Sequence, residues 1–144
     1  MADDEYRPQA PKFGWRHQFV EQDWSAVRRF IDHAFADPPR GHYLVEIIDS
    51  VLERGLSERL SITTSMHDLI IVDSPPSPPP IDVLIVRAPN SLYPPADGHV
   101  KIDYLAASNR NTSVERPQQE AVRVFWRMVE EKFGLRPTPS SPTS

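Results

Sequence analysis

Two short apolar runs, separated by a run of prolines, form the most regular hydrophobic pattern in the chain. They cover residues 69–72 and 81–86, the second interrupted only by Asp82. Both runs have the length and the β-branched content of buried strands. The prolines in residues 74–80 cannot donate ladder hydrogen bonds. The pattern therefore predicts two strands joined by a stiff, extended connection.

Two further segments alternate apolar and polar residues, which is typical of a strand with one face in water. They cover residues 59–64 and 99–105. The stretches 68–73 and 81–87 lack this alternation, so we expect neighbouring elements to cover both of their faces. Together the pattern predicts a mostly antiparallel sheet of about four strands.

Helical spacing appears on both sides of the predicted sheet. Residues 24–35 follow Asp23, a good N-cap, and place apolar side chains on one face. A second helix is expected from about residue 43 to 54, with Gly55 as its left-handed cap, although 43–48 also fits a strand. The clearest helix is the last, with Pro117 in its first turn and its end at Phe133 and Gly134.

The length of the chain favours one domain with its own core, because 144 residues is a common domain size. We expect this domain to cover residues 13–136. Residues 1–12 read as a flexible N-terminal arm, and residues 137–144 as a disordered tail of Pro, Ser and Thr. The predicted fold class is α+β: two N-terminal helices, the sheet, and a long C-terminal helix packed on one face.

Composition removes several classes of function. The net charge of −4 gives no support for nucleic-acid binding, and the absence of cysteine excludes disulfides and thiolate catalysis. The histidines lack metal-ligand spacing, and no glycine-rich phosphate loop occurs, so we expect no metal and no cofactor. No signal peptide and no membrane span are expected, which favours a soluble, cytoplasmic protein.

The ends of the proline run hold the first candidate binding residues. Asp73 and Asp82 bracket it, and a hairpin would bring them close enough for one carboxyl pKa to rise. Aspartates at strand ends also commonly accept hydrogen bonds from turn amides. Pro76 and Pro79 belong to Pro-x-x-Pro spacings, which fit an aromatic groove on a partner or serve only as a connection.

A polar run at residues 108–113 holds the remaining candidate binding residues, Asn109 and Asn111. Its side chains form local hydrogen bonds readily, so the run predicts a turn followed by a helix cap. At the end of a strand, the same run is also suited to recognise a polar ligand.

One arrangement has a catalytic interpretation. Pro80 and Asp82 are followed on the next predicted strand by His99 and Lys101, inside a helix–strand–strand–strand–helix order. This order resembles the core of the PD-(D/E)xK nucleases over about 90 residues. The resemblance implies a metal-binding Asp82 and a water-polarising Lys101, with His99 where the family has its second acidic ligand.

The sequence favours a small, non-catalytic protein that acts through protein–protein contact, in the manner of immunity proteins, antitoxins or secretion chaperones. Its predicted binding residues are Asp73, Pro76, Pro79, Asp82, Asn109 and Asn111. The alternative is a metal-dependent nuclease or other hydrolase that uses Asp82, His99 and Lys101. A third possibility is a homodimer built through edge strands or through the exposed part of the final helix.

Overall fold

The computed structural model describes residues 15–16, 18–37 and 40–135. The predicted arm 1–12 and tail 137–144 lie outside the described residues. The elements in chain order are α2 (Trp24–Ala34), α3 (His42–Glu53), β1 (Leu60–Ser65), β2 (Asp68–Asp73), β3 (Val83–Val86), β4 (His99–Leu105), β5 (Thr112–Pro117), a 3₁₀ turn (Gln118–Glu120) and α4 (Ala121–Phe133).

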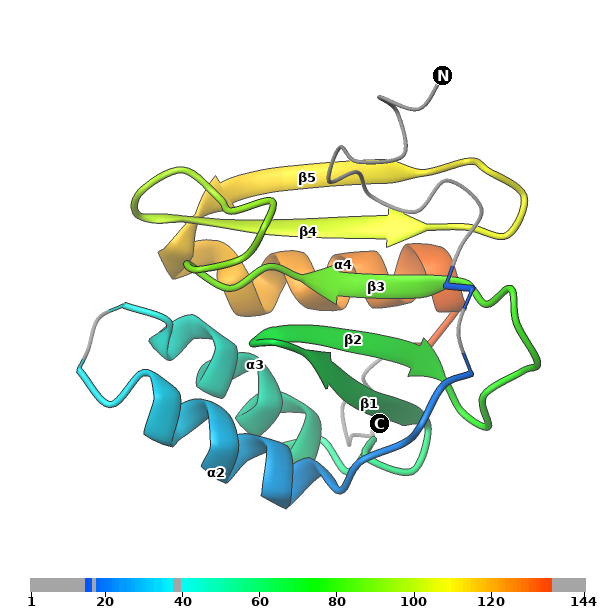
Figure 1. Ribbon diagram of the computed structural model, residues 1–144, viewed down its shortest axis with the longest axis horizontal. Coiled ribbons are helices and arrows are strands. Elements are labelled where there is room, and N and C mark those ends of the chain that lie inside the picture. The colour runs from blue at the N-terminus through cyan, green and yellow to red at the C-terminus, as the bar shows by residue number, and fades with distance from the viewer. Residues whose placement is uncertain (1–14, 17, 38–39, 136–144) are drawn as a thin grey trace, which may run out of the picture.

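The strands form one antiparallel sheet in which spatial order follows chain order, β1-β2-β3-β4-β5. Figure 1 shows α4 running along the sheet and α2 and α3 lying together beside β1 and β2. The α+β class is confirmed, with five strands instead of about four. No helix in the described ranges has the length and apolar content needed to cross a membrane.

The face of the sheet that meets the helices carries the larger hydrophobic core. Ile62, Ile71, Leu84 and Ile102 point into it from successive strands and are completely buried. Phe125 in α4 is equally buried in the same cluster. Removing a large apolar side chain from water contributes roughly 1.5–3 kcal/mol, so the helices are held chiefly by this packing.

The opposite face of the sheet has a smaller core of its own. Ile70, Val72, Val83 and Ile85 are buried there with Phe19, which belongs to the segment before α2. This second core explains why β2 and β3 lack alternation: apolar groups cover both of their faces. The prediction of two buried strands is confirmed, with β2 at the predicted residues and β3 shorter than the predicted 81–87.

Local signals place the first two helices as predicted. The carboxylate of Asp23 accepts a hydrogen bond from the Ala26 amide at 3.0 Å, which caps α2. Helix α3 ends where Gly55 takes a φ of 69°. The amide of Gly55 donates to the Leu52 carbonyl and the next amide donates to Val51, which together satisfy the last carbonyls of the helix.

The start of the final helix differs from the prediction. Pro117 is the last residue of β5, not part of the first helical turn, and α4 begins at Ala121 after the 3₁₀ turn. A proline fits this edge strand because its missing N–H would point away from the neighbouring strand. The C-terminal prediction holds, since Gly134 caps α4 with a φ of 70°.

Strand β5 itself was not predicted from the sequence. Residues 108–113, interpreted as a turn and a helix cap, instead contain the β4–β5 turn and the first two residues of β5. The strand holds one apolar residue, Val114, and most of its residues are exposed. An edge strand with so little to bury has no hydrophobic alternation to reveal it.

A charged network is buried beside the second core. The Arg87 side chain donates to Asp103 through Nε at 2.8 Å and to Asp68 through Nη1 at 3.1 Å. The exposed fraction of the arginine side chain is only 6%, and both carboxylate side chains are 10% exposed. Ser113 donates to Asp103 at 2.6 Å, and the Tyr93 ring stacks over the guanidinium at 5.0 Å. The network joins β2, β3, β4 and β5.

The outer edge of β1 is closed by the segment that precedes α2. The Trp24 indole donates to the Leu60 carbonyl, and the Gln22 amide donates to the Ile62 carbonyl, at 2.9 and 2.8 Å. The side-chain oxygen of Gln22 accepts from the Thr64 amide at 2.9 Å and from two threonine hydroxyls. Every second residue of β1 is thereby bound on its outer side.

We expect Gln22→Ala to lower the free energy of unfolding by about 1–2 kcal/mol, because it removes the acceptor of three hydrogen bonds. Urea unfolding measures this loss. Gln18→Ala, at an exposed position of the same segment, is the control and should leave the midpoint unchanged. Equal midpoints for the two variants would show that Gln22 does not hold the edge.

Candidate functional site

The residues that the sequence singled out for binding lie at one end of the sheet. The β2–β3 connection, residues 74–82, and the β4–β5 turn, residues 106–111, both leave the sheet at this end. These two segments, with the last residue of β2, contain Asp73, Pro76, Pro79, Asp82, Asn109 and Asn111. We call this part of the molecule the proline end.

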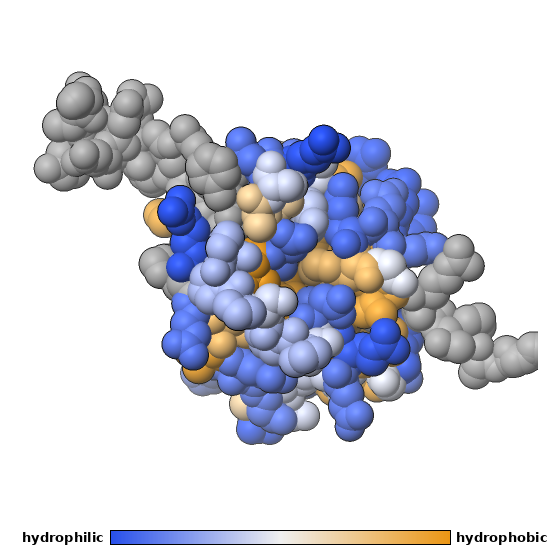
Figure 2. Space-filling model, turned by 90° about the vertical axis from the view of Figure 1, so that its right-hand side faces the viewer, coloured by the Kyte–Doolittle hydropathy of each residue, from blue (hydrophilic) through white to orange (hydrophobic). Residues whose placement is uncertain are grey.

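A hollow of about 320 Å³ opens at the proline end. Asp73 and Asp82 both line it, so the structure brings together the two carboxylates that bracket the proline run. Figure 2 looks onto this end and shows hydrophobic surface between hydrophilic groups. The lining residues are Asp73, Ser77, Pro80, Ile81, Asp82, Lys132 and Phe133.

Asp82 is tied to the β4–β5 turn across the sheet. One of its carboxylate oxygens accepts from the Ala107 amide at 2.8 Å, and the other accepts from the Tyr104 hydroxyl at 3.1 Å. The carboxylate therefore fixes a turn amide, as aspartates at strand ends commonly do. The amide that Asp82 fixes belongs to Ala107, which is 25 residues away in the sequence and not in a neighbouring turn.

Asn109 and Asn111 shape the turn that Asp82 holds. Asn109 adopts a φ of 69°, a conformation that asparagine tolerates better than most residues, and its amide donates to the Ala106 carbonyl at 2.8 Å. The side-chain oxygen of Asn111 accepts from the Ala106 amide at 2.9 Å. Both side chains thus build the proline end, and both residues are exposed to solvent.

The charges around the hollow are mixed. Burial, the negative charge of Asp82 and the hydrogen bond to it raise the pKa of Tyr104 to about 12, so this hydroxyl stays protonated and donating. The Lys132 ammonium lies 5.0 Å from the centre of the Tyr104 ring, a cation–π distance. The lining of the hollow thus includes one positive side chain, Lys132, and two negative ones, Asp73 and Asp82.

Asp73 contributes a carboxylate that is free to meet a ligand. Its backbone pairs with Leu60, and its side chain is exposed and has no hydrogen-bond partner among the described residues. Pro79 is exposed and Pro76 is half-buried in the connection that follows. The connection contains two cis peptide bonds, Ser74–Pro75 and Pro79–Pro80.

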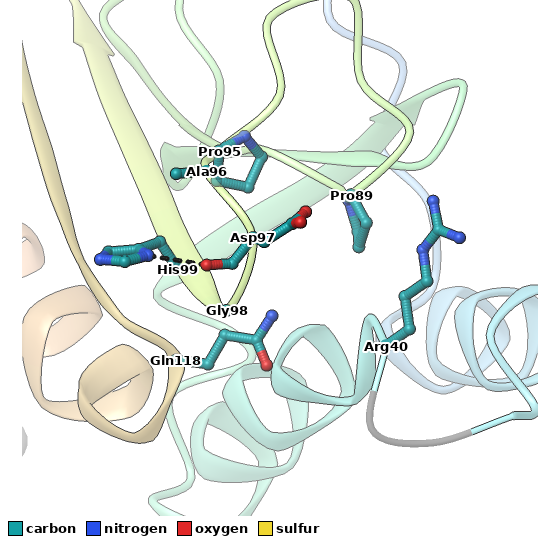
Figure 3. A pocket seen from close by; sticks show the side chains of 8 residues that line it. All are labelled: Arg40, Pro89, Pro95, Ala96, Asp97, Gly98, His99 and Gln118. Carbon is teal, nitrogen blue, oxygen red and sulfur yellow. Dashed lines mark hydrogen bonds between the residues drawn. The ribbon is translucent and has the colours of Figure 1, made fainter.

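His99 and Lys101 lie at the other end of β4. The strand is seven residues long, which places His99 roughly 20 Å from the end that Asp82 adjoins. A separate hollow of about 380 Å³ lies beside His99 and is also lined by Arg40, Asp97 and Gln118. Figure 3 shows the Asp97 and Gln118 side chains pointing into it. The His99 Nδ1 donates to the Asp97 carbonyl at 3.0 Å.

The structure does not assemble the nuclease-like arrangement of Asp82, His99 and Lys101. Val83 pairs with Leu105, so Asp82 stands level with Ala106, five residues beyond Lys101. Alternation along a strand then assigns Asp82 and Lys101 to opposite faces of the sheet. Within the described residues, no group of three or more histidine, aspartate or glutamate side chains could hold a metal ion.

Sequence reasoning gave no indication of the two members of the hollow that come from α4. Lys132 and Phe133 come from the last turn of α4, far along the chain from the proline run. The sequence predicted that the final helix ends at Phe133 and Gly134, but no pattern indicated which end of the sheet the helix would reach. That position depends on the register of the packed layers.

A scan of protein-family models and searches of curated proteins and of solved structures found no match to this chain.

Proposed function

We propose that this protein is a non-catalytic binding domain that contacts a protein partner through the proline end. The observation that carries the proposal is the convergence of Asp73 and Asp82 on one hollow beside an exposed proline connection and an exposed turn. A surface of this kind offers carboxylates and a proline-rich backbone of restricted conformation, and the restriction lowers the entropy lost on binding.

The bonding of the carboxylates supports binding over catalysis. Both oxygens of Asp82 already accept hydrogen bonds that hold the β4–β5 turn, whereas Asp73 has an exposed carboxylate available to a partner. A basic side chain from the partner would pair with Asp73, whose exposed carboxylate has no hydrogen-bond partner among the described residues. The separation of Asp82 from His99 and Lys101 gives no comparable support to the hydrolase alternative.

The test is the recovery of a partner from native lysate with immobilised protein. We expect the double variant Asp73→Asn, Asp82→Asn to retain about a tenth or less of the partner that the parent chain recovers, equivalent to at least 1.4 kcal/mol of binding free energy. Asparagine keeps the size of each side chain, and at residue 82 its oxygen accepts from the Ala107 amide while its NH2 group donates to the Tyr104 hydroxyl, so the fold should persist. Circular dichroism of the variant checks this.

Asp97→Asn is the matched control, because Asp97 is exposed and lies at the opposite end of the sheet. It changes net charge without touching the proline end, and recovery should equal that of the parent. An equal loss of recovery in both variants would reflect general charge and contradict the proposal. Recovery that is unaffected in the double variant would contradict it too. We also propose that the protein is cytoplasmic and that its partner is a protein and not a nucleic acid.

A further inference from the structure

The two outer edges of the sheet, β1 and β5, differ in the hydrogen bonding of their outward backbone groups. On β1, the outward carbonyls of Leu60 and Ile62 and the outward amide of Thr64 are bound by the segment that contains Gln22 and Trp24. On β5, the outward amides have no hydrogen-bond partner within the described residues. An edge with unpaired amides and carbonyls is a template for another strand.

The hydrogen bonds identify which groups of β5 face outward. The Gln118 amide donates to the Gly98 carbonyl. The backbone N–H and C=O groups of the even-numbered residues of β5 therefore point toward β4. Alternation directs the backbone groups of Ser113, Glu115 and Pro117 away from the sheet. Pro117 has no amide, which ends the available ladder at Glu115. Among the described residues, the Glu115 carbonyl accepts a hydrogen bond only from the side chain of its neighbour Arg116, at 3.2 Å.

We propose that β5 pairs with β5 of a second copy, antiparallel and centred on Val114, to give a two-fold dimer with one continuous sheet. In this register Ser113 of each copy lies opposite Glu115 of the other, and these are the residues whose backbone groups face outward. Thr112 lies opposite Arg116. No two like charges are then opposed.

The neighbouring registers are disfavoured, one by charge and the other by length. Centring the pair on Glu115 places two glutamates directly opposite each other, whereas centring it on Ser113 pairs only residues 112–114 within the strand. Like charges directly opposite on adjacent strands destabilise the pairing. The register centred on Val114 instead opposes two half-buried valines that already pack against the main core.

The closed edge of β1 fixes the size of the assembly. Once β5 is paired, each copy presents only the β1 edge, which its own residues already occupy. The contact is the same patch on both copies, so it forms a closed pair and not a filament. This inference is independent of the proposed contact at the proline end, which lies at the ends of the strands.

Single cysteines test the register, because the natural chain contains none. Val114→Cys places two cysteines at a non-hydrogen-bonded pair, where Cα atoms lie about 4.5 Å apart, within the range that a disulfide spans. Thr112→Cys is the control, since its two copies would lie roughly 13 Å apart along the strands. Under mild oxidation we expect at least about fivefold more disulfide-linked dimer from the first variant.

Sedimentation of the full chain provides the second arm. We expect a concentration-dependent dimer that Glu115→Ala preserves and Glu115→Pro abolishes, because only proline removes the outward amide. Both variants lose the Glu115 carboxylate, so the comparison isolates the backbone hydrogen bond. A parent chain that remains monomeric at every concentration overturns the proposal. Equal cross-linking of the two cysteine variants overturns the register.

Discussion

Replacing Arg87 by alanine should lower the free energy of unfolding by about 3–5 kcal/mol. The guanidinium lies between Asp68 and Asp103 and is almost wholly buried, so its removal leaves two carboxylates in the interior without their positive partner. Domains of this kind are stable by only about 5–15 kcal/mol, so the loss is a large fraction of the total. Urea unfolding followed by tryptophan fluorescence gives the value.

The matched control is Arg123→Ala, which removes an arginine whose ion pair with Glu120 lies on the surface of α4. That pair should contribute no more than about 0.5 kcal/mol. Should Arg87→Ala fail to fold, Arg87→Lys serves instead: it retains the charge but cannot donate to both carboxylates in the same geometry, and should be intermediate. Similar midpoints for Arg87→Ala and Arg123→Ala would refute the structural role of the network.

Gly41→Ala is expected to destabilise the protein by about 2–4 kcal/mol, the sum of a left-handed backbone penalty and steric overlap. Gly41 has a φ of 77° at the start of α3, and an added Cβ would lie 2.9 Å or less from three side-chain carbons of Phe35. The Phe35 ring packs edge-on against His67 at 5.4 Å, which limits its movement. Thermal unfolding measures the loss.

The other end of α3 provides the comparison. Gly55 has a φ of 69°, but nothing lies within 4 Å of a Cβ added there, so Gly55→Ala carries only the backbone penalty of about 1–2 kcal/mol. The difference between the two variants therefore reports the contact with Phe35. Equal losses at both ends would mean that the ring moves aside without cost.

The central strands could be predicted because their apolar side chains have to be buried. Strands β2 and β4 begin and end at the predicted residues, since β2 is apolar between its two terminal aspartates and β4 alternates cleanly. Helix limits were marked by residues with a local role, Asp23 as a cap and Gly55 as a left-handed turn. In each of these elements, one local constraint dominates.

The edge of the sheet and the layer contacts could not be predicted in this way. Strand β5 is held by backbone hydrogen bonds to β4 and by the bond from Ser113 to Asp103, neither of which leaves a hydrophobic pattern. At the candidate site, too, local sequence indicated some of the residues, and the packing of distant elements determined the others. Asp73 and Asp82 were placed together by a local connection, whereas Lys132 reaches them only through helix packing.

Hydrogen exchange on the free protein and on its complex with the recovered partner tests the proposed binding surface most directly. The amides of residues 107–111, together with those of Ser77 and Asp82, should exchange more slowly in the complex, because these residues form the proline end. Exchange in residues 88–98, at the opposite end, should not change. Protection of residues 88–98 with none at the proline end would contradict the proposed binding surface.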